Sequence, residues 1–344
     1  MFTAISTRFG AFAKLLGLLL ALTLVAAACG SADSVVTDSA DEAGDAAEDE
    51  AMEDEAMEDE AMEDEAMEDE AMEDEEVVEE EAVAADAELV IVSMSPTATE
   101  MLFAIGAGDY VVAVDNNSNF PAEAPTDEAL TSFPVNVEGI IGYGPTHVVS
   151  SGPIEGLEEV GIENIALNFA ATFDDTYTQI EQLGALTGNV GEAAELVSQI
   201  QTDLDAIVAA TDAPEGLSYY HELDNTFFSS TSSTFVGQVY SLFGLENIAD
   251  AADPDGESFG FPQLTEEFLI TADPDLIFLA DTICCGQTAE TVAARPGWDA
   301  LSAVTNGNVI ELNDDIASRW GPRIVEFAQT ISDSVNAIET ADAS

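Results

Sequence analysis

From residue 89 onward, short apolar runs alternate with stretches in which apolar residues recur every three to four positions. The short runs predict buried strands and the longer stretches predict helices. We expect strands at 89–92, 111–114, 147–150, 164–167, 217–221, 276–280 and 308–312, and helices at 97–105, 137–143, 192–208, 234–243 and 322–337. Strands separated by single helices imply right-handed βαβ units and mostly parallel sheets.

One helical pattern is longer than the others. Between residues 192 and 208, one helical face is apolar for about four turns, through Leu196, Ile200, Leu204 and Ile207. Pro214-Glu215-Gly216 then interrupts the chain, and a second α/β series begins. The predicted fold class is therefore α/β, with an N-terminal lobe at 89–187, a bridging helix at 188–212 and a C-terminal lobe at 213–344. Loops at the carboxyl ends of parallel strands converge in such a fold, which favours a ligand cleft between the lobes.

The first thirty residues have the pattern of a secretory signal. Arg8 and Lys14 precede an apolar run from Leu15 to Ala28. As a helix this run spans about 21 Å, less than the roughly 30 Å hydrocarbon layer, so residues 1–28 are predicted to be a signal peptide. The small residues before Cys29 resemble a bacterial lipobox, which predicts lipidation of Cys29 and attachment to the extracytoplasmic face of the cell membrane. The alternative is ordinary cleavage with Cys29 incidental.

Acidic residues are concentrated in the next segment. Of 344 residues, 70 are Asp or Glu and 5 are Lys or Arg, for a formal net charge of −65. Residues 31–88 hold 29 of the acidic side chains and no basic one, and Ala-Met-Glu-Asp-Glu occurs five times in succession. Like charges at this density keep a chain extended, so residues 29–88 are predicted to be a disordered acidic linker. The overall charge excludes nucleic acid and anionic headgroups as electrostatically attracted partners.

Several motifs occur in the order and at the spacing of one protein family. The segment from Ser93 to Gly108, SMSPTATEMLFAIGAG, resembles the opening of the cobalamin and ferric-siderophore binding proteins of ABC importers. Further matching segments are FPAEA at 120–124, NVEGI at 136–140, YYHE at 219–222, FVG at 235–237, NIAD at 247–250, DPDLI at 273–277, RPGW at 295–298 and GPR at 321–323. The resemblance extends from about residue 89 to 338.

This resemblance implies a monomeric, lipid-anchored substrate-binding protein with the class III periplasmic-binding-protein fold, whose rigid helix permits only small closure. Its implied partners are a metal chelate and a permease–ATPase complex. Two surface glutamates, Glu138 and Glu267, would pair with permease arginines; the alternative is that both are solvated helix carboxylates. By motif alignment, the residues expected at the cleft are Asn116, Asn117, Phe120, Phe133, Ser151, Asn168, His221, Phe261, Arg319 and Trp320.

The small number of cations constrains the charge of the ligand. After the signal peptide the chain has no lysine and only three arginines, Arg295, Arg319 and Arg323. Burying a ferric tricatecholate of charge −3 requires clustered cations. A neutral or cationic chelate is therefore predicted, either a hydroxamate siderophore complex or a cobalamin. Asn117 and Ser151 stand where the cobalamin binders carry aromatic residues, which weakens the expectation of corrin stacking.

Cys284 and Cys285 are adjacent in the loop after strand 276–280, where the resemblance places part of the cleft. In an oxidising compartment they can form a vicinal disulfide. The alternatives are two reduced buried thiols or a metal site. Two cysteines without a nearby histidine cannot build a closed four-ligand zinc site locally.

Other functions have weaker support. His147 and His221 belong to no H-E-x-x-H or G-x-S-x-G signature, so we predict no enzyme activity; His147 is expected to be a core residue, and His221 a ligand contact or a packing residue. The segment from Asp253 to Glu257 resembles a calcium loop only faintly, which leaves a receptor for a free metal ion or another small solute as an alternative. A ligand-sensing lipoprotein of the same fold is a further one. Nothing indicates a bound cofactor or a resident metal.

Overall fold

The computed structural model describes residues 88–342, with side chains through residue 338. The predicted signal peptide, Cys29 and all but the last residue of the predicted linker lie outside the described residues. Within the described part, no helix is both long enough and apolar enough to cross a membrane.

The N-terminal lobe is built on a four-stranded parallel sheet with the strand order β2-β1-β3-β4. Its strands are β1 (Ile91–Met94), β2 (Val111–Val114), β3 (His147–Ser150) and β4 (Glu163–Ala166). Strand β1 is buried along its whole length because it lies inside the sheet and helices cover both faces. The helices are α1 (Pro96–Ala104), α2 (Val137–Gly142) and α3 (Phe173–Thr187).

The C-terminal lobe repeats this arrangement with the parallel order β6-β5-β7-β8. Its strands are β5 (Ser218–Glu222), β6 (Glu246–Asn247), β7 (Leu276–Leu279) and β8 (Val309–Glu311). Its helices are α5 (Phe235–Ser241), α6 (Glu266–Ala272), α7 (Thr282–Cys285), α8 (Ala289–Ala293), α9 (Ser302–Asn306), α10 (Asp314–Ser318) and α11 (Ile324–Asp342). The predicted class, two α/β lobes with parallel sheets, is confirmed.

Helix α3 was not among the predicted elements. Its inward face includes two threonines and a glycine besides Ile180 and Leu183, so the apolar period is diluted. The helix starts in a capping box, in which the Thr172 hydroxyl accepts from the backbone N–H of Asp175 and the Asp175 carboxylate accepts from the backbone N–H of Thr172. This box uses aspartate where the usual motif has glutamate or glutamine, which makes it harder to find in the sequence.

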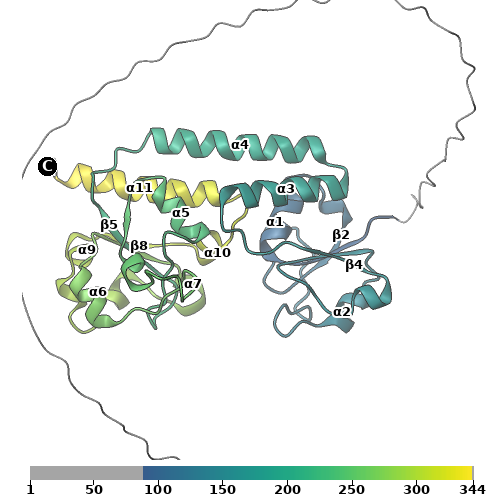
Figure 1. The fold of residues 1–344 in the computed structure, drawn as a ribbon, viewed down its shortest axis with the longest axis horizontal. Helices are drawn as coiled ribbons and strands as arrows, with labels where there is room; N and C mark the ends of the chain where they lie inside the picture. Colours follow the sequence, from purple (N-terminus) through teal and green to yellow (C-terminus); the bar gives the residue numbers. More distant parts are fainter. Residues whose placement is uncertain (1–87, 343–344) are drawn as a thin grey trace, which may run out of the picture. The chain divides into compact units, whose positions relative to one another are not determined.

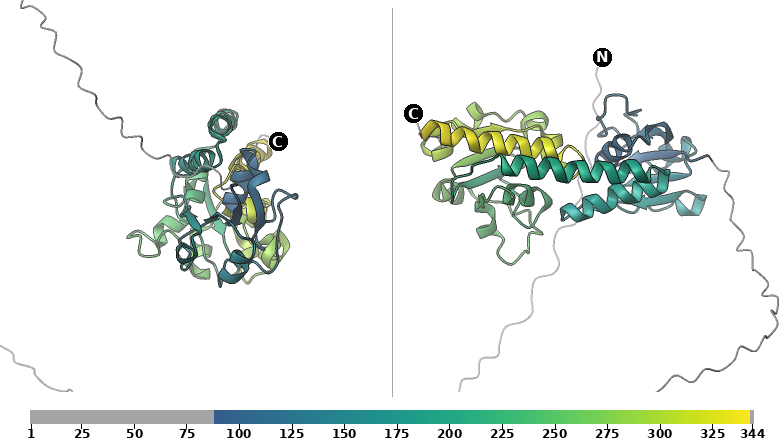
Figure 2. Two further views of the ribbon diagram at one scale, coloured as in Figure 1. Left: turned by 90° about the vertical axis from the view of Figure 1, so that its right-hand side faces the viewer. Right: turned by 90° about the horizontal axis from the view of Figure 1, so that it is seen from above.

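Helix α4 (Val190–Ala209) runs alongside both lobes (Figures 1 and 2). Its 20 residues span about 30 Å at 1.5 Å per residue. It packs against α3 of the N-terminal lobe and α11 of the C-terminal lobe, and its buried face consists of Ala193, Val197, Ile200 and Leu204. These residues belong to one continuous hydrophobic core that includes β1 from the first lobe and β5 from the second. The shared core opposes independent swinging of the lobes.

Replacing Ile200 with Ala should destabilise both lobes together. Ile200 is buried in the shared core, and truncating such a residue costs about 2–5 kcal/mol of unfolding free energy. We expect far-UV circular dichroism and tryptophan fluorescence to report one coincident urea transition at a lower midpoint, with Gln201→Ala on the exposed face as the control. Two separated transitions would contradict the shared core.

Candidate functional site

Loops at the carboxyl ends of the N-terminal strands form one wall of a pocket of about 460 Å³. Residue 116 follows β2, residue 151 follows β3 and residue 169 comes shortly after β4. The opposite wall comes from α10 and the residues that follow it. The lining residues are Pro96, Thr97, Asn116, Asn117, Asn119, Ser151, Phe169, Asp315, Ser318, Arg319 and Trp320. Amide and hydroxyl groups from the asparagine, serine and threonine residues make up much of this lining.

A second pocket, of about 490 Å³, shares Phe169, Ser318 and Trp320 with the first. Its lining comes from both lobes and contains no charged residue: Phe169, Ala170, Ala171, Leu223, Ser233, Thr234, Phe235, Val236, Phe259, Phe261, Ser318 and Trp320. Because the two pockets share three residues, they form one inter-lobe cleft with a polar part and an apolar part.

Trp320 occupies the junction of the two pockets. Its indole Nε1 donates to Oε1 of Gln179 at 2.8 Å, and its ring centroid lies 4.7 Å from that of Phe169. The Gln179 amide in turn donates to the backbone oxygen of Asn168 at 2.7 Å. The hydrogen bond to Gln179 fixes the orientation of the indole, and the ring of Phe169 packs against the indole on one side.

A buried ionic cluster joins the lobes beside this cleft. The Glu100 carboxylate, on α1, has a side chain only 1% exposed. It accepts from Arg319 at 2.7 Å and from Arg323 at 2.5 and 2.9 Å. Arg319 also donates to Asp315 at 2.7 Å and to the backbone oxygen of Asn117 at 3.0 Å. Two guanidinium groups of the C-terminal lobe thus form ion pairs with one carboxylate of the N-terminal lobe.

The third arginine is also bound to a carboxylate. Arg295 donates to both oxygens of the buried Glu222 carboxylate, each at 2.6 Å, and its guanidinium lies 4.6 Å from the ring centroid of Trp298. His147, on β3, lies 3.3 Å from the Glu163 carboxylate. Within residues 88–338, therefore, each arginine is paired with a carboxylate, and none lies unpaired at the cleft.

The structure does not place His221 at the cleft. Its side chain is fully buried, Nδ1 lies 2.8 Å from the Tyr240 hydroxyl, and its ring packs near Phe327. Burial lowers the pKa of His221 to about 3, so the imidazole is neutral at physiological pH. Of the two readings predicted for His221, packing is the one that the structure favours, because its β5 position points into the core.

The other expected cleft residues do not all lie at the joined pockets. The first pocket is lined by Asn116, Asn117, Ser151, Arg319 and Trp320, and the apolar one by Phe261. Asn168 lines a neighbouring pocket beside α3. Phe120 lies under Arg323, whose guanidinium is 4.2 Å from its ring centroid, so this ring supports the ionic cluster. Phe133 is 97% exposed and lines none of these pockets.

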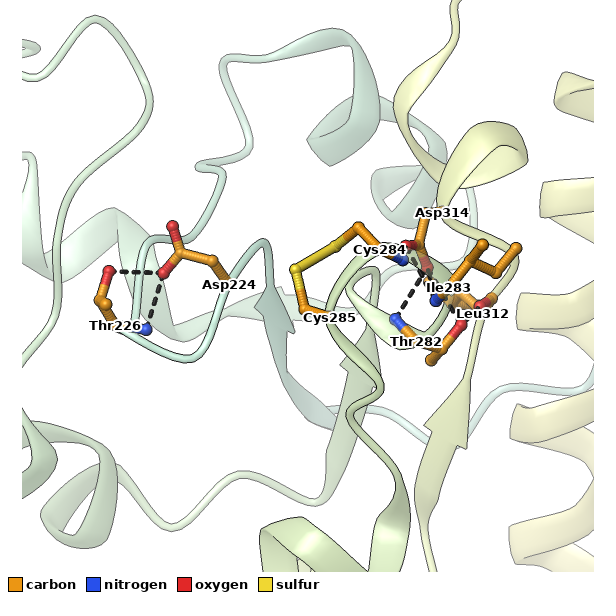
Figure 3. The surroundings of a disulfide bond; sticks show 8 residues. All are labelled: Asp224, Thr226, Thr282, Ile283, Cys284, Cys285, Leu312 and Asp314. Carbon is orange, nitrogen blue, oxygen red and sulfur yellow. Dashed lines mark hydrogen bonds between the residues drawn. A yellow bond between two sulfur atoms is a disulfide. The ribbon is translucent and has the colours of Figure 1, made fainter. Parts of the chain in front are cut away.

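Cys284 and Cys285 are joined by a disulfide at the end of α7, as Figure 3 shows. The first turn of α7 is held by Asp314, whose carboxylate accepts from the backbone N–H groups of Thr282, Ile283 and Cys284 at 2.7–3.1 Å. Both cysteines are exposed, unlike the buried thiols of the alternative, and neither lines the joined pockets. Among the described residues, no group of three or more His, Cys, Asp or Glu side chains is placed to hold a metal ion.

Asp281, directly before α7, is fully buried, and neither of its carboxylate oxygens has a hydrogen-bond partner. Burial, together with the nearby Glu222 charge, raises the pKa of Asp281 to about 7. The nearby Tyr220 hydroxyl is also buried, and burial raises its pKa well above the ordinary value.

Sequence reasoning missed two aromatic residues of the cleft. Phe169 directly follows the predicted residue Asn168, and Phe259 lies two positions before the predicted Phe261. The two residues are 75% and 89% exposed. For Phe169 the available signal was its place shortly after a strand, whereas Phe259 lies far from any strand end, and only the fold shows that both residues line one pocket.

Comparison with known proteins identifies similar chains. The sequence profile of the periplasmic binding protein family matches residues 91–316. The ABC transporter substrate-binding lipoprotein YvrC of Bacillus subtilis is 29% identical, over 71% of this chain and 79% of the relative. The vitamin B12-binding protein of Pectobacterium carotovorum is 26% identical, over 74% and 91%. The crystal structure of the vitamin B12 binding protein BtuF of Vibrio cholerae matches with a TM-score of 0.57 at 25% identity, over 72% and 97%.

Replacing Glu100 with Gln should weaken the joint between the lobes. Gln keeps the shape of the side chain, but Arg323 loses its carboxylate partner and Arg319 keeps Asp315 as its one carboxylate partner. Breaking a buried pair in this way costs about 3–5 kcal/mol of unfolding free energy. Because buried pairs are screened little by salt, the loss measured by urea unfolding should persist at high ionic strength.

The matched control is Glu326→Gln, which removes an exposed carboxylate close to Arg323. A surface change of this kind should stay within about 0.5 kcal/mol. If both variants lost the same small amount, Glu100 would have no special role at the joint.

Proposed function

Because the chain belongs to the periplasmic binding protein family, we propose that it captures a neutral or cationic metal chelate in the inter-lobe cleft and delivers it to an ABC permease. The family consists of solute-binding proteins, and relatives named for vitamin B12 binding cover most of the described chain. Cobalamins and ferric hydroxamate complexes are the proposed ligand classes.

The observation that carries this proposal is the pairing of every arginine in the described chain. Glu100 holds Arg319 and Arg323, and Glu222 holds Arg295. A buried anionic ligand needs a cation in place of its lost hydration. Freeing an arginine for that purpose would leave a buried glutamate uncompensated, so the cleft disfavours ligands of strong negative charge.

The two parts of the cleft support a ligand that is polar at one end and apolar at the other. Asn116, Asn117 and Ser151 offer amide and hydroxyl groups along one pocket, which can exchange hydrogen bonds with neutral amide or hydroxamate groups. The apolar pocket offers aromatic rings to a hydrocarbon surface. A neutral chelate with both kinds of surface matches this lining.

Delivery would use one carboxylate on each lobe. Glu138 lies in the first turn of α2 and Glu267 in the first turn of α6, and both are exposed. Exposed ion pairs contribute little energy but set the register of an encounter. Two separated pairs with permease arginines would therefore orient the binding protein on the transporter.

Attachment to the membrane would use Cys29. One relative is named a lipoprotein, and Cys29 follows the predicted signal peptide. We propose that the acyl-modified cysteine holds the protein at the extracytoplasmic face of the cell membrane and that residues 30–88 are the spacer between anchor and lobes.

Calorimetric titration with ligands of graded charge tests the ligand class. We expect cyanocobalamin or a neutral ferric trihydroxamate to bind, and a ferric tricatecholate to bind at least roughly 100-fold more weakly, a difference of about 2.7 kcal/mol. Unfolding measured with and without each ligand provides an independent check, since a ligand stabilises the folded state that it binds. Preferential binding of the tricatecholate would overturn the charge argument.

Replacing Glu138 and Glu267 together with Gln should lower transport without changing ligand affinity. Each exposed pair is worth up to about 1 kcal/mol, so losing both should reduce permease docking by roughly tenfold. Uptake of labelled ligand by cells gives the first quantity and calorimetry the second. Glu192→Gln with Glu195→Gln, an equal charge loss on exposed positions of α4, is the control; equal uptake by both double variants would remove the docking assignment.

A further inference from the structure

We propose that Cys284 and Cys285 form a thiol–disulfide exchange site whose oxidation state sets how firmly the start of α10 is held beside the cleft. The reactant that this site takes is a dithiol. The inference goes beyond the proposed function and does not depend on which ligand the cleft binds. The two cysteines are joined by a disulfide at the end of α7, both are exposed, and neither lines the joined pockets.

This disulfide contributes little to the stability of the fold. A disulfide restricts the unfolded chain more when it closes a longer loop, and this one joins residues with a sequence separation of 1. It links no distant segments, unlike the disulfides that hold small secreted domains together. The C-terminal lobe already has a hydrophobic cluster of its own around Tyr220 and Trp298. Stability therefore does not account for the pair, whereas exposure is typical of disulfides that undergo exchange.

The disulfide is presented on a short closed turn. The backbone N–H of Gln287 donates to the backbone oxygen of Asp281 at 3.2 Å, which closes the turn around α7. The sulfur atoms lie on the side of α7 that faces away from Asp314 and toward the turn that carries Asp224 (Figure 3). Because both cysteines are exposed, a thiolate can reach the sulfur atoms from solvent.

Exchange with a dithiol conserves atoms and electrons. One thiolate of the dithiol attacks a sulfur of the pair, forms a mixed disulfide and expels the other sulfur as a thiolate, which takes up a proton. The second thiolate of the dithiol then attacks the mixed disulfide, and the remaining cysteine leaves and is protonated in turn. The pair gains two electrons and two protons while the dithiol is oxidised to a disulfide. The reverse reaction restores the bond between Cys284 and Cys285.

The oxidation state of the pair reaches α10 through Asp314, the first residue of that helix. The Asp314 carboxylate accepts from the backbone N–H of Cys284 at 2.7 Å and of Thr282 at 2.8 Å. While the disulfide is intact, the two side chains and the peptide bond between them belong to one small ring, which restricts the backbone at Cys284. Reduction opens this ring, so the N–H group that Asp314 accepts from is held less firmly. Helices α7 and α10 then loosen together.

Helix α10 carries this effect to the polar pocket. Asp315 and Ser318 line that pocket, and so does Arg319, which directly follows the helix. The Asp315 carboxylate accepts from Arg319 at 2.7 Å and from the Asn119 amide of the N-terminal lobe at 2.8 Å. A change in how the start of α10 is held therefore alters both the polar lining and a contact between the lobes.

Charge limits which dithiols react readily. The chain has 41 acidic residues after position 88 and three arginines, all of them paired with carboxylates. Two carboxylates, Asp224 and Asp314, belong to the surroundings of the disulfide (Figure 3). A negative surface slows the approach of anionic thiols and favours cationic ones. The preferred reactant is therefore a dithiol in positively charged surroundings, such as a basic protein surface.

Alkylation before and after reduction tests the site in the full-length protein. The wild type is treated with N-ethylmaleimide under native conditions, with and without prior dithiothreitol, and the adducts are located by peptide mass spectrometry, which separates them from any adduct at Cys29. We expect no adduct at Cys284 or Cys285 before reduction and one at each cysteine afterwards. Adducts before reduction, or none after it, would overturn the exchange site.

Hydrogen exchange of the same samples tests the coupling. Reduction should speed amide exchange at least roughly tenfold in peptides covering 282–287 and 314–318, leave α2 at 137–142 unchanged and leave the urea midpoint where it was. The double variant Cys284→Ser with Cys285→Ser should show the fast rates without reductant and no response to it. Faster exchange at 282–287 alone would overturn the coupling to α10. Faster exchange across the whole C-terminal lobe would identify a stabilising crosslink and overturn the proposal.

Reduction rates with charged thiols test the charge preference. Cationic cysteamine should reduce the pair faster than anionic mercaptoethanesulfonate, and the ratio of the two rates should fall as salt is added, because salt screens the surface charge. A ratio that salt does not change would remove the preference for a cationic reactant. None of these measurements uses a cleft ligand, so their failure would leave the proposed function standing, and failure to bind a chelate would leave the exchange site standing.

Discussion

The Glu100 carboxylate is the constraint on which the rest of the molecule depends. It is buried in the first helix of the N-terminal lobe and is neutralised by Arg319 and Arg323 from the far end of the chain. A buried carboxylate can remain ionised only with such partners. The same contacts that join the lobes also withdraw the nearby cations from the cleft. The cohesion of the two lobes and the proposed charge of the ligand thus rest on the same interaction.

The shared core acts in the same direction as this ionic joint. Helix α4 packs on α3 of one lobe and α11 of the other, and one contiguous hydrophobic cluster along it contains residues of both lobes, in addition to a smaller cluster within each lobe. Separating the lobes would expose apolar surface from both. A shared core of this kind favours a nearly preformed cleft, in which the lining residues would contribute more to selectivity than closure would.

The lining shows how an acidic chain can still offer an apolar surface. Many of its carboxylates are exposed or accept from backbone N–H groups, as Asp253 does in the turn around Phe259 and Asp314 does at α7, while the buried Glu100 and Glu222 are paired with arginines. Acidic side chains therefore shape the turns around the cleft while staying out of its apolar part.

The sequence alone determined the α/β class, the two-lobe plan and the long helix near 192–208, because each follows from a period of apolar residues within a short window. It also supported the prediction of a ligand without strong negative charge, since the three arginines can be counted without a fold. The tertiary structure decided which groups those arginines meet, because Arg319 and Glu100 are separated by 219 positions and no local pattern links them. Only the tertiary structure shows that His221 lies in the core, that Phe120 packs against Arg323 and that Phe169 and Phe259 are exposed. Side-chain direction at a strand end depends on what packs against the strand, and that is decided only when distant segments meet.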